Sequence, residues 1–161
     1  MKKIAIYPGT FDPVTNGHID LVERGLRIFD EIIIAVTTAY KKSPLFTIEE
    51  RIEIIRTAVK DCNKVTVEPF SGLLVEYARS RGGVAVLRGL RAVSDYEYEL
   101  QMALMNRRLD YNIETVFLMP SEEFSYVTST IIKEIASLGG SIRGLVPENV
   151  EAELKKKYKK P

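Results

Sequence analysis

The feature that most constrains the fold is the regular alternation of short apolar runs with helical patterns. Strands separated by helices pair in parallel through right-handed crossovers, and the helices cover both faces of the sheet. The sequence therefore predicts an α/β protein with a five-stranded parallel sheet and helices on both faces. The expected strands are Lys3–Tyr7, Ile32–Thr37, Val65–Phe70, Val84–Leu87 and Thr115–Met119.

Helix signals lie between these strands and after the last one. Thr47 and Glu50 form a capping-box pattern at the start of one helix. Gly82 and Gly139 stand where two other helices would stop, and Pro147 is placed as an N1 proline. The expected helical segments are 19–29, 47–60, 73–81, 95–109, 130–138 and one beginning at Pro147.

Composition limits the possible partners. The chain has 23 Lys and Arg against 22 Asp and Glu, without the basic excess of dedicated polyanion binders. Its longest aliphatic run, Ile32–Val36, is far too short to span a membrane, and its one cysteine, Cys62, cannot form an intramolecular disulfide. We therefore expect a single domain over residues 1–161 that is cytoplasmic and binds small molecules or copies of itself, with no nucleic acid and no membrane as partners.

The loop after the first expected strand has the features of an anion site. In open parallel sheets, ligands bind outside the carboxyl ends of the strands. A helix begins near Gly17, where free N–H groups and the helix dipole favour an anion. Gly17 would let a phosphate approach the backbone. His18 is the only histidine, and an anionic partner explains its place at a helix start better than a surface role does.

Cations follow two other strands. Arg88 and Arg91 come directly after the fourth strand, and arginine is suited to bidentate phosphate recognition. Ion pairing is the alternative for these arginines, and it applies chiefly to Arg91. The candidate partners on the following helix are Asp95, Glu97 and Glu99. Lys42 follows the second strand and, taken alone, is typical of a solvated basic loop.

Three hydroxyl residues, Thr128, Ser129 and Thr130, follow the fifth strand at a helix start. An ordinary N-cap needs only one of them, so a second phosphate-binding helix end is expected. Together the cations and hydroxyls predict a polyphosphate site at one edge of the sheet. We find no carboxylate pair for hydrolysis and no zinc ligand set. The pattern therefore favours phosphoryl or nucleotidyl transfer by positioning and charge stabilisation.

These residues also carry a family resemblance. Gly9–Pro13 with Thr15–His18 resembles the [HT]-x-G-H signature of the nucleotidyltransferase superfamily. Within it, Arg88–Arg91, Asp95–Glu99 and Pro147–Val150 are similar to the bacterial phosphopantetheine adenylyltransferases. The similarity runs from about Ile4 to Val150.

The resemblance implies a Rossmann-like fold and a reaction. ATP and 4′-phosphopantetheine would give dephospho-coenzyme A and pyrophosphate with Mg²⁺, in the penultimate step of coenzyme A synthesis. It also implies a homohexamer, with coenzyme A as a feedback ligand.

The family pattern further implies residue roles. His18 stabilises the charge on the α-phosphate in the transition state, and Thr10 lies between the two substrates. Lys42 and Arg88 hold the acceptor phosphate, and Leu74 lines the pantetheine site. The catalytic residues that the pattern implies are His18, Thr10, Lys42 and Arg91. The residues implied for ATP are Thr10, Phe11, His18, Gly89, Leu90, Arg91, Glu99, Phe124, Ser125, Tyr126, Val127, Thr128, Ser129 and Thr130.

Two other functions fit parts of the pattern. A sister enzyme that uses CTP and a phosphorylated alcohol would share the first motif. A non-catalytic nucleotide- or RNA-binding module is supported only by the tail Lys155–Lys160, which is better explained as a solvated helix end.

Met102, Met105 and Leu109 on the long helix fit either a core or an interface.

Overall fold

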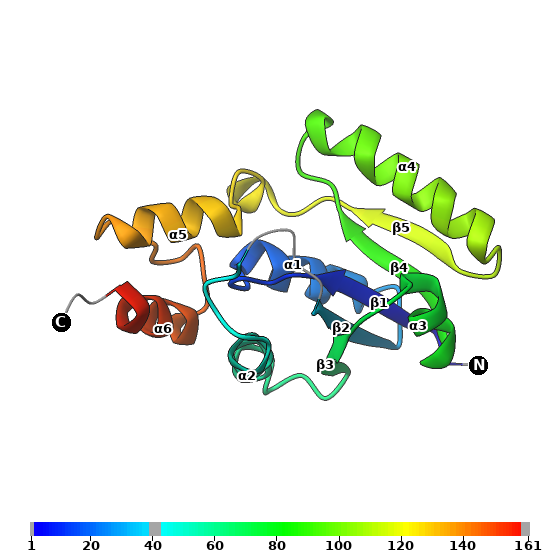
Figure 1. Ribbon diagram of the computed structural model, residues 1–161, viewed down its shortest axis with the longest axis horizontal. Coiled ribbons are helices and arrows are strands. Elements are labelled where there is room, and N and C mark those ends of the chain that lie inside the picture. The colour runs from blue at the N-terminus through cyan, green and yellow to red at the C-terminus, as the bar shows by residue number, and fades with distance from the viewer. Residues whose placement is uncertain (1, 39–42, 159–161) are drawn as a thin grey trace.

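The fold is built on one parallel sheet with the strand order β3-β2-β1-β4-β5 (Figure 1). The computed structural model describes residues 2–38 and 43–158. All four strand pairings are parallel, which confirms the predicted α/β class and Rossmann-like sheet. The strands are β1 (Ile4–Gly9), β2 (Glu31–Thr37), β3 (Val65–Phe70), β4 (Gly83–Gly89) and β5 (Glu114–Leu118).

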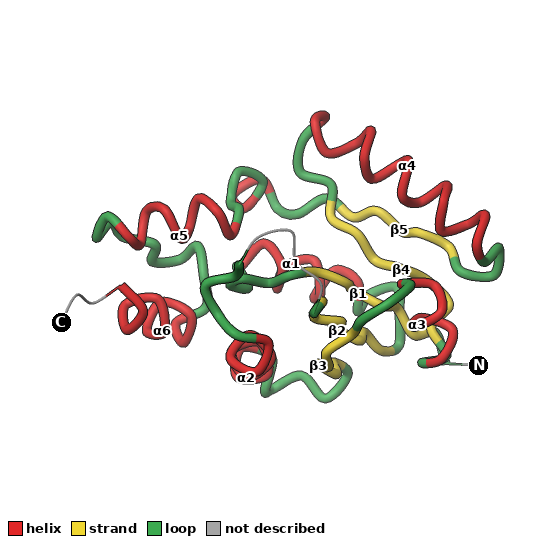
Figure 2. Tube along the Cα trace, in the orientation of Figure 1, coloured by secondary structure: helices red, strands yellow, loops and turns green. Residues whose placement is uncertain are grey.

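The helices occur where the sequence predicts them, as Figure 2 shows along the chain. The predicted capping box of Thr47 and Glu50 is confirmed, with each side chain accepting from the other residue's backbone N–H. The first helix ends earlier than expected, at Gly25, with Leu26 as its C-cap. The helices are α1 (Asn16–Gly25), α2 (Ile48–Ala58), α3 (Leu74–Ser80), α4 (Val93–Leu109), α5 (Ser129–Ser137) and α6 (Glu148–Tyr158), with a 3₁₀ turn at Glu122–Phe124.

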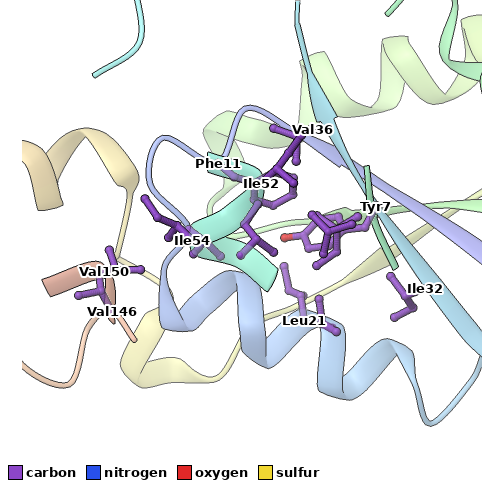
Figure 3. Close-up of a cluster of buried hydrophobic side chains, with 14 of the residues drawn as sticks. Tyr7, Phe11, Leu21, Ile32, Val36, Ile52, Ile54, Val146 and Val150 are labelled. Atoms are coloured by element: carbon purple, nitrogen blue, oxygen red, sulfur yellow. The ribbon is translucent and has the colours of Figure 1, made fainter. Parts of the chain in front are cut away.

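The alternation of side chains along the strands divides the core between the two faces of the sheet. Ala5 and Tyr7 of β1 point into the larger cluster, which α1, α2, α5 and α6 complete. Ile6 points into the smaller cluster, which α3 completes through Val75 and Ala78. Figure 3 shows the larger cluster, where Leu21 of α1 lies near Tyr7 and Ile32 of the sheet. Both faces of the sheet are therefore buried, as a parallel sheet requires.

The topology creates a crevice at the centre of the sheet. The chain leaves β1 for its neighbour β2 on one side, while β4 pairs with β1 on the other. Crossovers in opposite directions separate the loops at the carboxyl ends of β1 and β4, which is the switch point where α/β sheets bind ligands. Helices α5 and α6 lie beyond this edge of the sheet (Figure 1).

Helix α4 lies along β5 at the edge of the sheet, and its outer side is uncovered (Figure 1). Met102, Met105 and Leu109 are 40%, 54% and 48% exposed, so they are not core residues of the folded chain. None of the helices formed by the described residues has the length and apolarity that crossing a membrane requires.

We predict that Ile132→Ala lowers the free energy of unfolding by about 2–5 kcal/mol, because it leaves a cavity in the larger core cluster. Ile132 is fully buried on α5, whereas its neighbour Ile131 is 41% exposed. Ile131→Ala is the matched control and should cost less than about 1 kcal/mol. Urea unfolding of both variants measures the difference, and equal losses would contradict the assignment of α5 to the core.

Candidate functional site

The crevice holds a cavity of about 770 Å³, a size typical of small-molecule sites. The loops after β1, β4 and β5 and the starts of α1 and α5 surround it. Eleven of the residues predicted for the site line this cavity: Thr10, Phe11, His18, Arg88, Gly89, Arg91, Phe124, Val127, Thr128, Ser129 and Thr130.

Other predicted residues are not brought into the lining. Leu74 packs against the smaller core cluster on the other face of the sheet. Lys42 lies outside the described residues, although Ser43 and Pro44, which follow it, line the cavity. The predicted residues that do not line the cavity are Leu74, Leu90, Glu99, Ser125 and Tyr126.

The first turn of α1 fixes the orientation of His18. Thr15 is the N-cap, and its backbone N–H donates to Nδ1 of His18 at 3.0 Å. The Thr15 Oγ1 atom also lies 3.0 Å from Nδ1 and accepts from the backbone N–H of His18. This is a capping box in which His18 replaces the usual Glu or Gln. Because Nδ1 accepts a hydrogen bond, the proton of the neutral ring is on Nε2.

The surroundings of His18 keep the ring neutral. Burial, together with the positive charges of Arg91 and Arg88, lowers the pKa of His18 from 6.5 to about 4. The edge of the Phe11 ring packs against it, with ring centroids 5.1 Å apart at an angle of 71°. Phe11 itself is buried and has a positive φ of 50°. At neutral pH, His18 is therefore an uncharged hydrogen-bond donor held in place on two sides.

Arg88 is fixed by a two-point ion pair with Glu99 of α4. Its Nε donates to Oε2 at 2.8 Å, its Nη2 to Oε1 at 2.5 Å, and its Nη1 to the carbonyl of Pro8 at 3.2 Å. Burial alone lowers the pKa of Arg88, but the hydrogen bonds and charge of Glu99 raise it above the usual range. The guanidinium is therefore charged and rigid at the cavity wall.

Arg91 has only a loose partner, with 3.5 Å between its Nε and Oδ2 of Asp95. The ion pair considered for Arg91 is therefore present with Asp95, but the tighter pair is that of Arg88 with Glu99, for which ion pairing was given less weight. Glu99 is eleven residues from Arg88 in sequence, and only the packing of α4 against β5 and the end of β4 brings their side chains together.

The hydroxyl run at the start of α5 has divided roles. Thr128 is the N-cap, and its Oγ1 accepts from the backbone N–H of Ile131 at 3.1 Å. Ser129 donates to the carbonyl of Pro13 at 2.7 Å, which ties α5 to the β1–α1 loop. Thr130 is exposed at the cavity. The N-termini of α1 and α5 thus both face the cavity, and both favour an anion there.

Sequence analysis missed two charged residues of the cavity wall, Lys133 and Asp12. Lys133 of α5 lines the cavity, and its Nζ donates to Oδ2 of Asp12 at 2.6 Å. Lys133 follows Ser129 by four residues, so both lie on one face of α5, and this helical spacing could have revealed it.

Gly17 has a packing role that the sequence did not indicate. A Cβ atom at this position would lie 3.3 Å from Cβ of Phe124, so the glycine lets the loop after β5 pack on α1.

Comparisons with known proteins agree with this geometry. Residues 6–135 match the family described as cytidylyltransferase-like. A phosphopantetheine adenylyltransferase from Oleidesulfovibrio alaskensis is 58% identical over 159 residues, which cover 99% of this chain and 94% of that protein. This chain belongs to the phosphopantetheine adenylyltransferase family. A second member, from Thermodesulfovibrio yellowstonii, is 56% identical over 161 residues, covering 99% of this chain and all of that protein.

The fold of this phosphopantetheine adenylyltransferase family member also matches a more distant crystal structure. A Vibrio parahaemolyticus protein, named provisionally as a nicotinate-nucleotide adenylyltransferase, superposes with a TM-score of 0.73 over 98% of this chain and 95% of its own. At 18% identity this likeness concerns the fold alone. The family membership shown by the close relatives makes the chain an enzyme of the nucleotidyltransferase class.

We predict that the free adenylyltransferase has a neutral His18 protonated on Nε2, with a pKa near 4. Since His18 is the only histidine, nitrogen-15 NMR of the imidazole reports on it without overlap. An unfolded histidine titrates near 6.5 and takes up its proton first as the pH falls. The contribution of His18 to stability should therefore be complete above about pH 6.5 and lost between there and about pH 4. A proton on Nδ1, or a midpoint at 6.5 or above, would contradict the structure.

Proposed function

We propose that the protein transfers the adenylyl group of ATP to 4′-phosphopantetheine, giving dephospho-coenzyme A and pyrophosphate in the penultimate step of coenzyme A biosynthesis. The observation that carries this proposal is the 58% identity to a phosphopantetheine adenylyltransferase over 99% of the chain. The cavity supports it, because two helix N-termini and fixed cations surround a space large enough for polyphosphate ligands.

The proposed chemistry needs no covalent enzyme intermediate. A phosphate monoester has a second pKa near 6, so the acceptor phosphate is already ionised at neutral pH and requires no general base. One of its oxygens attacks the α-phosphorus of ATP. The bond between the α-phosphorus and the bridging oxygen of the β-phosphate breaks, and pyrophosphate leaves with those electrons. The enzyme has to align two polyanions and stabilise the charge that develops between them.

We infer the residue roles by combining the family pattern with the groups that line the cavity. His18 donates a hydrogen bond from its Nε2–H to an α-phosphate oxygen, and the capping box with Thr15 keeps the ring proton on Nε2. Thr10 lies between the substrates. Arg88, with Lys42, binds the acceptor phosphate, and Leu74 contacts the pantetheine chain beyond the cavity. Arg91 and the start of α5 bind the nucleotide phosphates, and the loop 124–127 contacts the adenine.

We propose that Mg²⁺ enters as the complex with ATP. Over residues 2–38 and 43–158, no three or more His, Cys, Asp or Glu side chains are grouped so that they could hold a metal ion. Mg²⁺ commonly keeps several waters and binds through substrate phosphates, so it needs no protein cage. Within this reaction the metal neutralises phosphate charge, while the residues above bind and orient the two substrates.

The proposed assembly is a homohexamer that uses α4 as a subunit contact. Large apolar side chains are exposed along this helix, a pattern typical of interaction surfaces. They are Tyr96, Tyr98, Leu100, Met102, Leu104, Met105 and Leu109. Coenzyme A is the proposed feedback ligand, because it contains the same pantetheine phosphate as the substrate. A cytoplasmic location agrees with the free Cys62.

We predict that the purified protein forms pyrophosphate and dephospho-coenzyme A from ATP, Mg²⁺ and 4′-phosphopantetheine. His18→Ala should fold normally and lose roughly 10²–10³-fold in kcat, as when a transition-state hydrogen-bond donor is removed. Pyrophosphate release with mass detection of the product measures both. Product formed from CTP and a phosphorylated alcohol, and none from ATP, would favour the cytidylyltransferase alternative.

We predict that Met105→Glu dissociates the assembly, because it places a charge in the apolar surface of α4. Leu138→Glu is the control, since Leu138 is an equally apolar and 81% exposed residue beyond the end of α5. Size-exclusion chromatography with light scattering gives the mass of each variant. A hexamer that survives Met105→Glu, or a wild-type monomer, would argue against α4 as the contact.

A further inference from the structure

A buried arginine underlies one wall of the cavity. Arg51, near the start of α2, has no exposed surface and is the largest of the fully buried side chains. Taking a guanidinium out of water is costly unless its N–H groups are hydrogen-bonded. The groups that receive these hydrogen bonds therefore show what the side chain organises.

Arg51 donates to carbonyl groups at the ends of two neighbouring strands. Its Nη1 lies 2.6 Å from the carbonyl oxygen of Thr10 and 3.3 Å from that of Thr37. The β1–β2 pairing ends at Gly9 and Val36, one residue before these two carbonyls. The guanidinium thus lies where β1 and β2 separate, and it supplies donors just beyond the last paired residues.

Asp12 makes a second connection between the loop after β1 and the start of α2. Its carboxylate is buried and accepts from the backbone N–H groups of Leu45 and Phe46, both at 2.9 Å. Leu45 and Phe46 directly precede Thr47, the N-cap of α2. The loop at residues 10–12 therefore accepts from α2 through Thr10 and from the segment before α2 through Asp12. We call these four hydrogen bonds of Arg51 and Asp12 the buried clamp.

The buried clamp holds two parts of the cavity wall at a fixed distance. Thr10 lines the cavity from the end of β1, while Ser43 and Pro44 line it from the segment that Asp12 holds at Leu45. Arg51 donates to the carbonyl groups of Thr10, Thr37 and Thr47, at the ends of β1 and β2 and the start of α2. The buried clamp reaches α5 through Asp12, whose Oδ2 also accepts from Nζ of Lys133 at 2.6 Å.

We propose that Arg51 is a positioning residue for binding of the acceptor. Arg51 acts through Thr10 and the 43–44 segment and does not touch a substrate. This inference rests on the proposed function, in which Lys42, the residue that precedes Ser43 in the sequence, binds the phosphate of 4′-phosphopantetheine. A lysine at this position would keep the charge, but its single ammonium group cannot reproduce the planar fork that reaches the carbonyls of Thr10, Thr37 and Thr47. Arg51→Lys therefore tests the geometry separately from the charge.

The experiment measures the dissociation constants of 4′-phosphopantetheine alone and of ATP alone by titration calorimetry, so that no turnover is needed. We expect Arg51→Lys to weaken acceptor binding by about tenfold and ATP binding by no more than about threefold, a smaller loss that arises through Thr10 between the two substrates. Arg56→Lys is the matched control. Arg56 is on the same helix and also donates to a backbone carbonyl, that of Val67 in β3 at 3.1 Å, away from the cavity. It should change neither dissociation constant.

The alternative is a purely structural role for Arg51. A lower melting temperature with unchanged acceptor affinity, or an equal loss for both ligands, would overturn the proposal. If Arg51→Lys does not fold, Asp12→Asn tests the other half of the buried clamp. Its amide opposes one of the two backbone N–H groups and also removes the charge that pairs with Lys133. Acceptor affinity within twofold of wild type, or an equal loss of ATP affinity, would overturn the proposal in that case.

The two proposals remain separable. A wild-type protein that binds 4′-phosphopantetheine but forms no dephospho-coenzyme A would contradict the proposed reaction alone. Selective loss of acceptor binding in Arg51→Lys would still support the positioning role. A wild-type protein that does not bind 4′-phosphopantetheine would overturn both.

Discussion

Parallel pairing is the constraint on which the rest of this structure depends. Because all five strands run in the same direction, their carboxyl ends share one edge, and the loops after them meet there. Burial of both faces under helices leaves this edge as the place where polar chemistry can be exposed to a ligand. The opposite crossovers from β1 and into β4 then open the crevice in which the cavity forms.

Charged side chains at this edge are held by the protein itself before any substrate arrives. Arg88 is fixed by Glu99, Lys133 by Asp12, and Arg51 by the carbonyls it bonds. Each pairing offsets part of the cost of taking a charge out of water. A polyanion that enters the cavity therefore meets groups already in place, and little reorganisation is left for the moment of reaction.

The capping box at the start of α1 serves both the fold and the chemistry. Thr15 satisfies a free N–H of the helix and, through its own backbone N–H, determines which nitrogen of His18 carries the proton. One hydrogen bond of the capping box thus stabilises the helix end, and the other leaves the Nε2 donor of His18 for the cavity. Substitution of Thr15 would remove the Oγ1 cap but keep the backbone N–H that donates to Nδ1, so the cap and the position of the proton depend on different atoms of one residue.

The α/β class, the five strands, the helix positions and the sheet edge that carries the cavity could all be predicted from the sequence, because they follow from local periodicity and strand direction. The sequence also indicated about half of the cavity lining, since His18, Arg88 and Thr128 lie at or beyond the carboxyl ends of the predicted strands. Tertiary packing sets the remaining contacts: Arg88 pairs with Glu99, Lys133 and Asp12 join the wall, Gly17 accommodates Phe124, and Leu74 packs away from the cavity. These contacts join residues distant in sequence, and which ones form depends on how the helices pack across the sheet, which no local pattern records.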